Sequence, residues 1–203
     1  MISEGDFIDI PIEDDIFPEA YDIIYGIRGS GPLGEGRNYG AADARRNSFE
    51  TPGERNSGVS KAILQRLLKR PVVFGLRDGN KYDWLINGRT WANKTLSNRY
   101  DAPALNHRVT FEEYKLKNLL NVDNWIITSI CWDTENIPQR PHLTVCGVIS
   151  ENKLFEVASP MRRGETIGAG KQFEAAMTGL ELEYSKLDKF RLEEMIDDKV
   201  ATA

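Results

Sequence analysis

Polar and apolar residues follow two different periods in the first third of the chain. Residues 6–12, DFIDIPI, alternate between the two kinds and predict a strand. Residues 16–27, IFPEAYDIIYGI, place apolar side chains at helical spacing after two aspartates that can cap a helix. Helical spacing returns over residues 57–70, SGVSKAILQRLLKR, with a serine as the cap. The chain therefore begins with one predicted strand and two predicted helices.

The remaining apolar segments predict a sheet with helices beside it. Short apolar runs predict strands at residues 72–76, 124–132 and 142–149. Helical spacing or helix caps are found at residues 109–120, 151–158 and 185–199. The sequence shows no internal repeat and no dividing linker. We therefore predict one α/β domain over residues 1–203, with a mixed central sheet flanked by helices.

Residues 28–57 interrupt this order of elements. They have no apolar periodicity and are rich in Gly, Arg, Asn, Asp and Ser. A loop of this length inside a compact domain is uncommon unless it is functional or disordered. We therefore predict a long mobile loop here, and we expect it to close over a bound nucleic acid.

Composition narrows the function only slightly. The chain has 203 residues and a formal net charge of −5, which argues against a polycation that coats nucleic acid but permits a local basic cleft. No apolar run approaches a membrane span, and the acidic N-terminus does not resemble a signal peptide, so we expect a cytoplasmic protein without membrane contact. Cys131 and Cys146 lie in apolar runs. We expect buried free thiols, while a disulfide between neighbouring strands stays open.

Two short motifs have simpler explanations than the chemistry they suggest. Gly29, Gly31 and Gly34 match the glycine pattern of dinucleotide-binding loops, but a predicted helix precedes them where a strand is required. His142 opens a predicted strand, and no second histidine has the spacing that phosphoesterase chemistry requires. Neither motif predicts a site.

The most informative segment is YDWLINGRTWANKTLSN, residues 82–98. An Asn-Gly pair at residues 87–88 predicts a two-residue type I′ hairpin, which sets the register of both strands. That register places Asp83 opposite Ala92, with Lys94 one step along the same face. Opposed Cβ atoms lie about 4.5–5.5 Å apart, so an acid at position 92 would share a divalent cation with Asp83. With only Asp83 and Lys94, a cross-strand ion pair at a sheet edge explains the hairpin equally well.

Two carboxylates and a lysine are the groups that metal-dependent phosphodiester hydrolysis needs, because the ion activates water and the lysine orients it or stabilises charge. The segment YDWLINGRTWANKT resembles the core of PD-(D/E)XK nucleases, where an Asp precedes a hairpin that ends in Asp/Glu-x-Lys. The order of predicted elements over residues 57–158 follows the same plan. The resemblance implies a restriction-endonuclease-like fold and a Mg²⁺- or Mn²⁺-dependent DNA endonuclease, and the general style of the sequence suggests a phage or restriction origin. Asp83 would be a metal ligand, position 92 the second ligand and Lys94 the catalytic lysine.

Two positions depart from that family's pattern. The acid expected two residues before Lys94 is Ala92, and the glutamate that many relatives carry near the start of the preceding helix is replaced by Lys61. Glu50 or Glu54 on the preceding loop are the acids that remain to take its place. Ala92 has three explanations: a deliberate acid-to-alanine change, an acid that has migrated to another element, or a natural nuclease-like protein that binds without cutting. We favour the first of these.

Other residues are candidates for contact with DNA or for a second site. Arginines in predicted loops offer planar donors that match phosphate oxygens. They are Arg45, Arg46, Arg55, Arg99, Arg162 and Arg163. Glu113 and Lys115 have the spacing of a nuclease Glu-x-Lys and form a fallback pair, although a capping box that starts at Thr110 already explains Glu113. The alternatives from other classes are a silent nucleic-acid-binding or host-enzyme-inhibiting protein and a phage structural protein, and a homodimer is left open.

Overall fold

The fold of the protein is known from a computed structural model, which describes residues 6–25, 49–73, 82–98, 108–112, 122–132, 140–160 and 179–196. Within these residues the strands are β1 (Ile8–Pro11), β2 (Trp84–Ile86), β3 (Arg89–Asn98), β4 (Arg108–Glu112), β5 (Asn124–Cys131), β6 (His142–Ser150), β7 (Ser159–Pro160) and β8 (Gly179–Glu183). The helices are α1 (Ile16–Tyr25), α3 (Pro52–Leu68), α6 (Glu151–Val157) and α7 (Leu192–Ile196), with a 3-10 turn at Tyr184–Lys186.

A mixed sheet of five strands lies at the centre of the described part, in the order β1-β6-β5-β3-β2. β3 and β5 run parallel, whereas the other neighbouring pairs are antiparallel. A second sheet contains β4, β8 and β7. The predicted class, α/β with a mixed central sheet flanked by helices, is therefore confirmed.

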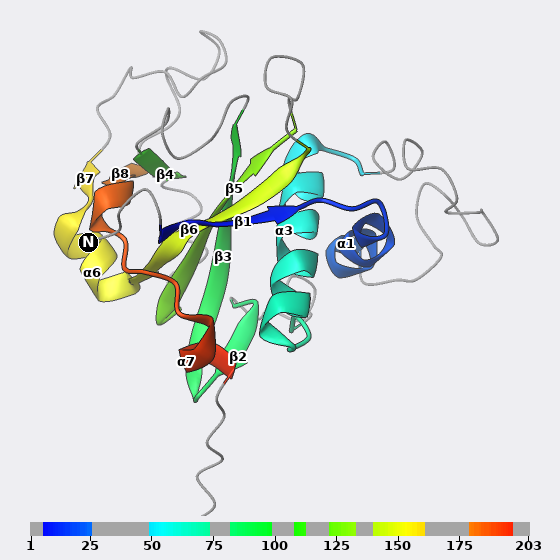
Figure 1. Cartoon of the computed structure of the whole chain (residues 1–203). Coiled ribbons are helices and arrows are strands. Elements are labelled where there is room, and N and C mark those ends of the chain that lie inside the picture. Colours follow the sequence, from blue (N-terminus) through cyan, green and yellow to red (C-terminus); the bar gives the residue numbers. More distant parts are fainter. Residues whose placement is uncertain are drawn as a thin grey trace, which may run out of the picture.

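The two faces of the central sheet are covered by different elements. Helices α1 and α3 lie together on one side, and β4, β8 and α6 lie on the other (Figure 1). Consecutive residues of β5 show this division, because side chains alternate between the faces of a strand. Trp125 packs in a cluster with Phe111 of β4, and Ile126 packs in a cluster with Leu64 of α3. The face on which a β3 side chain lies thus decides whether it meets α3 or β4.

Helix α3 begins earlier than the sequence pattern indicated. Thr51 is its N-cap, with Pro52 in the first turn and a capping box in which Thr51 Oγ1 accepts from the Glu54 amide while the Glu54 carboxylate accepts from the Thr51 amide. Such a box satisfies amides that the first turn leaves without partners. The predicted loop 28–57 is therefore wrong for its last residues, which are helical, and residues 28–48 lie outside the described part.

Helices α1 and α3 approach each other closely at Gly58. A Cβ added at Gly58 would lie 2.7 Å from the carbonyl oxygen of Ala20 and 2.8 Å from Cγ1 of Ile24, so only glycine fits there without a shift. Farther along α3, Arg66 Nε donates to the carboxylate of Glu19 at 2.7 Å. These contacts hold the two helices as one layer against the sheet.

Three other predicted elements differ from the structure. The predicted helix 109–120 is wrong where it is described, since Arg108–Glu112 is strand β4, paired antiparallel with β8. Of the predicted tail helix 185–199, residues 185–196 are described, and they contain the end of the 3-10 turn and the short helix α7 in place of one continuous helix. Of the predicted strand 72–76, only residues 72 and 73 are described, and they are not in a strand. Strand β4 pairs with β8, which lies far away in the sequence, and a local pattern carries no information about such a partner.

Both cysteines are buried and free, as predicted, and no disulfide joins them. Burial raises the pKa of the Cys146 thiol to about 12, so this side chain stays protonated and unreactive. No helix in the described ranges is both long and apolar enough to cross a membrane.

Candidate functional site

The hairpin of β2 and β3 forms with the predicted turn and register. Asn87 and Gly88 both have positive φ, 52° and 72°, as a type I′ turn requires. The paired residues are Ile86 with Arg89, Leu85 with Thr90 and Trp84 with Trp91. The strand pairing predicted from the Asn-Gly turn is therefore confirmed for these three pairs.

The predicted pair of Asp83 with Ala92 does not form. Strand β2 begins at Trp84, and the backbone amide of Asp83 donates at 2.7 Å to the carbonyl of Trp91, the residue already paired with Trp84. Two consecutive residues thus oppose one, which is the arrangement of a β-bulge and interrupts the alternation of side chains. The Asp83 side chain therefore does not lie on the face of the hairpin that the predicted register assigned to it.

The Asp83 carboxylate is bound on both oxygens. Oδ1 lies 2.6 Å from Nζ of Lys61 in α3, and Oδ2 accepts a hydrogen bond from the backbone amide of Asn93 at 2.7 Å. The side chains of Lys61 and Asp83 are only 11% and 14% exposed. This is a largely buried ion pair that joins the helix layer to the hairpin.

Lys61 is the site residue whose role sequence reasoning missed, because the family pattern presents it only as a missing glutamate. It lies on α3 at i, i+3 and i+7 spacing with Leu64 and Leu68, which are both fully buried. A lysine within a buried apolar stripe requires an opposite charge nearby. The helical spacing of Lys61 with two leucines is therefore the feature of the sequence that indicates an acidic partner for Lys61.

Ala92 and Lys94 lie on the face of β3 that meets β4. Ala92 is 4% exposed and belongs to the cluster that contains Phe111 and Trp125. The Lys94 ammonium lies 5.8 Å from the centre of the Phe111 ring, within the range of a cation–π contact. The structure therefore brings Ala92 and Lys94 together on one face, while the Asp83 carboxylate is held by α3.

A band of polar side chains extends the contact between α3 and the sheet. The Asn93 amide Nδ2 donates to the carbonyl of Ile126 at 3.1 Å and to Thr128 Oγ1 at 3.0 Å. Ser60 Oγ of α3 lies 2.8 Å from the same Thr128 hydroxyl, and Thr95 Oγ1 donates to Asn93 Oδ1 at 2.7 Å. Buried polar networks of this kind add stability and specificity when their members are satisfied. This band fixes Asn93, whose backbone amide holds Asp83.

The residues at Asp83 do not fit a divalent cation. Mg²⁺ and Mn²⁺ take several oxygen ligands, usually including one or two carboxylates. Within the described ranges, no three His, Cys, Asp or Glu side chains are grouped so that they could hold a metal ion. Asp83 is committed to Lys61, and the second expected position is the buried alanine.

The other predicted site residues are mostly outside the described part of the chain. Those are Arg45, Arg46, Arg99, Glu113, Lys115, Arg162 and Arg163. Arg55 is described: its guanidinium carbon lies 4.5 Å from the centre of the Trp132 ring, at the N-terminal end of α3. Trp132 Nε1 in turn donates to Asn56 Oδ1 at 2.7 Å.

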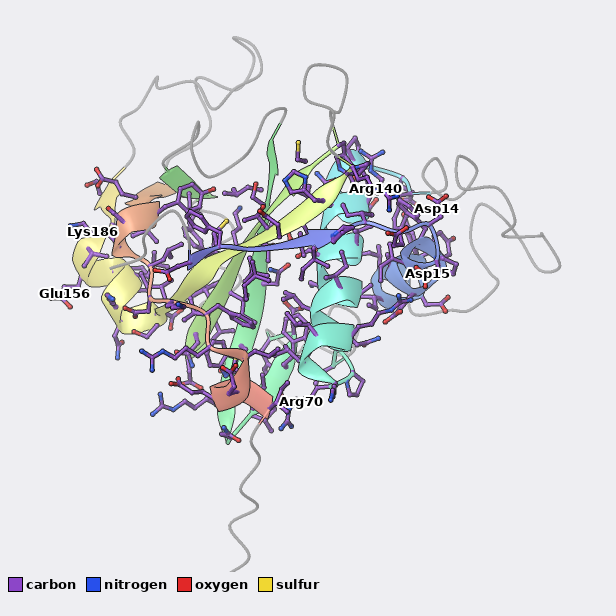
Figure 2. The ribbon with its side chains drawn as sticks, in the orientation of Figure 1. Asp14, Asp15, Arg70, Arg140, Glu156 and Lys186 are labelled. Carbon is purple, nitrogen blue, oxygen red and sulfur yellow. The ribbon has the colours of Figure 1, made fainter. Side chains whose placement is uncertain are left out.

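Many charged side chains among the described residues are exposed, in contrast to Lys61 and Asp83. Figure 2 shows Glu156 and Lys186 at one end of the molecule, near α6, and Asp14 and Asp15 at the other, near α1. All four are exposed. An ion pair shielded from water is therefore a distinct feature of the α3–hairpin contact.

Asp123, just before β5, anchors the turn end of the hairpin, which is the end away from Asp83. Its carboxylate accepts from Thr90 twice, from the backbone amide at 2.8 Å and from the hydroxyl at 2.9 Å. These two hydrogen bonds lower the pKa of Asp123 below its ordinary value. A lowered pKa in the folded state means that ionised Asp123 stabilises the fold at neutral pH.

We expect the pH dependence of stability to report this anchor. Asp123→Asn should unfold at lower urea concentration than the wild type near neutral pH. The difference should shrink as the pH falls below about 4, the ordinary aspartate pKa, because the wild-type carboxylate is then protonated. The measurement is urea unfolding from about pH 7 down to about pH 3. A difference that stays constant over this range would show that the hydrogen bonds do not depend on the charge.

Comparison of the chain with protein-family models, with curated proteins and with solved structures finds no match.

Proposed function

We propose that the protein binds nucleic acid through a nuclease-like arrangement of elements and does not cut it. The observation that carries this proposal is the commitment of Asp83 to Lys61 at 2.6 Å, in a largely buried pair. Together with the buried Ala92, it removes the two free carboxylates that metal-dependent hydrolysis would use. A chain in which Asp83 is paired with Lys61 and position 92 is alanine keeps a nuclease-like order of elements but lacks the two carboxylates that would bind a metal ion.

The order of elements supports the nuclease-like part of the proposal. Helix α3 precedes the β2–β3 hairpin, a crossover follows, and β5 then lies parallel to β3 with β6 beside it. The helix, the hairpin and the two later strands follow the order that the resemblance to PD-(D/E)XK nucleases implies, whereas the described residues 108–112 of the connection form strand β4 and not the expected helix. A restriction-endonuclease-like fold is thus part of the proposal.

The two departures from the family pattern support a natural non-cutting protein over an engineered alanine. A single deliberate change would leave the helix glutamate in place. Here the helix position is Lys61, and its ammonium neutralises the one acid that remains, Asp83. Complementary changes at separate positions are what a natural chain would accumulate once it no longer held a metal.

Arginines that the sequence places before α3, after the hairpin and after α6 support nucleic acid as the partner. Phosphate contacts from arginine position a protein on a duplex without reading its sequence. The local charge of such segments matters more for binding than the net charge of −5. We expect binding that tolerates many sequences and weakens steeply with salt.

The proposal predicts binding without cleavage. Fluorescence anisotropy with a labelled DNA duplex, at low and at moderate salt, should show saturable binding, and supercoiled plasmid should stay intact in Mg²⁺ or Mn²⁺. Plasmid cleavage that Asp83→Asn abolishes would instead favour a metal-dependent endonuclease. An absence of binding to both DNA and RNA would favour the host-enzyme-inhibiting alternative.

A pair of arginine variants sharpens this test. Arg45→Ala/Arg46→Ala should weaken binding about equally for different sequences and reduce the slope of log K against log salt by about 1 for each phosphate that an arginine no longer neutralises. A matched control is Lys189→Ala/Arg191→Ala, which removes two exposed charges already paired with Asp6 and Glu194. Equal weakening by both pairs would indicate a general charge effect.

A further inference from the structure

The Asp83 carboxylate is neutralised in the way that a bound cation neutralises a metal ligand. Its first oxygen meets the Lys61 ammonium at 2.6 Å, and its second meets the backbone amide of Asn93 at 2.7 Å. Both side chains are more than four-fifths shielded from water, at 11% and 14% exposure. A charge buried to this extent needs an opposite charge beside it. Here the Lys61 ammonium and the Asp83 carboxylate balance each other.

The surrounding contacts fix both charges before any ligand is present. Ser60, next to Lys61 on α3, meets the Thr128 hydroxyl of β5 at 2.8 Å. Asn93, which holds the second oxygen of Asp83, donates through its side chain to the same Thr128 at 3.0 Å. The helix side and the hairpin side of the ion pair are thus tied to one residue of the central sheet. The ammonium is held at this place by the fold.

A divalent ion at Asp83 would have to displace the ammonium from its carboxylate. The displaced Lys61 would stay largely buried without the charge that balances it, and it would repel the ion. We infer that the Lys61 ammonium is a built-in counter-cation that replaces a bound divalent ion between α3 and the hairpin. The fold is therefore complete without metal, and one substitution, Lys61→Glu, converts it into a metal-dependent fold.

The geometry favours this conversion. A glutamate oxygen is one bond nearer to the backbone than Nζ of lysine, so in Lys61→Glu it would stand back from Asp83 by about one bond length. The gap would suit an ion whose oxygen ligands lie about 2.0–2.6 Å from it. Without an ion, two carboxylates would face each other in a shielded place and oppose folding.

Thermal unfolding in EDTA and in MnCl₂ tests this inference. The wild type should melt at the same temperature in both, and so should Lys61→Met, a variant of similar length without charge. Lys61→Glu should melt lowest in EDTA and rise by about 5–10 °C when Mn²⁺ is present at about 100 times its Kd. The added change Asp83→Asn should abolish that rise. If Lys61→Glu does not fold in EDTA, refolding from urea gives the same comparison, and recovery only with Mn²⁺ supports the inference.

Three outcomes would overturn it. The first is a Mn²⁺-dependent rise in the wild type that Asp83→Asn removes, because the ion would then already be held at Asp83. The second is a rise in Lys61→Glu no larger than that in Lys61→Met. The third is equal failure of Lys61→Glu to refold with and without Mn²⁺. The inference shares the commitment of Asp83 with the proposed function, but its test measures folding and uses no nucleic acid, so either can fail alone.

Discussion

Lys61→Met is expected to lower the free energy of unfolding by about 3–5 kcal/mol, the range found when one partner of a buried ion pair is removed. Methionine fills nearly the same space, so the loss reports the charge. Asp83 would keep the Asn93 amide but would lose its counter-charge in a place where its side chain is 14% exposed. Urea unfolding followed by tryptophan fluorescence measures the change, with an unchanged m value as the check on the unfolded state.

An exposed ion pair of the same length is the control. Lys153 lies 2.6 Å from Asp188, but the two side chains are 36% and 56% exposed. Lys153→Met should therefore cost no more than about 1 kcal/mol. Adding Asp83→Asn to Lys61→Met should recover much of the loss, because it removes the unbalanced charge. Additive losses in that double variant would contradict a coupled pair.

The hairpin was predictable because its information is local. An Asn-Gly pair can adopt two successive positive φ values at little cost, and the turn then determines which residues of the flanking strands face each other. Three pairs follow that register from Ile86 with Arg89 to Trp84 with Trp91. The prediction failed one residue later. The bulge at Asp83 depends on a carboxylate drawn to Lys61 and to the Asn93 amide, and no pattern in residues 82–98 contains that information.

Two capping boxes had opposite outcomes. Thr110 with Glu113 suggested a helix, but residues 108–112 form a strand that pairs with β8, about seventy positions later in the chain. Val109 and Phe111 alternate with polar residues there and are buried. Thr51 with Glu54 stands within a Gly- and Arg-rich segment that predicts a loop, yet it caps α3. A capping box leads to a helix only when the apolar face of the residues after it can pack against another layer of the fold.

The candidate site was predictable in its residue types more than in its geometry. Asp83 and Lys61 both stand out from the sequence, one as a ligand and the other as a departure from a family pattern. Their contact joins α3 to the start of β2, so it depends on how the helix lies across the sheet. A charged residue in a stripe with Leu64 and Leu68 is the kind of local conflict that marks a buried partner.

Ala92→Asp is expected to destabilise the protein by at least about 3 kcal/mol without creating cleavage. Ala92 is 4% exposed among the side chains of a cluster that includes Phe111 and Trp125, so the new carboxylate would be buried in apolar surroundings. It would also face β4, whereas the Asp83 carboxylate is bound to Lys61 of α3. Two acids that lie on opposite faces of the sheet would not share an ion. Urea unfolding and a plasmid assay with Mg²⁺ or Mn²⁺ measure the two parts of this result.

The pH dependence of Ala92→Asp separates burial of charge from simple crowding, with Ala92→Asn as the control of equal size. Burial raises the pKa of an introduced carboxyl above its ordinary value of about 3.9. Below that value the carboxyl is protonated in both the folded and the unfolded state, so the two variants should be similarly stable. As the pH rises, the unfolded state ionises first, and Ala92→Asp should become progressively less stable than Ala92→Asn. The opposite trend would mean that the new acid is ionised in the fold and paired with a cation, for which Lys94 on the same face is the nearest candidate along β3. Metal-dependent cleavage by Ala92→Asp, abolished again on adding Lys94→Ala, would show that Asp83 leaves Lys61 to complete a catalytic site.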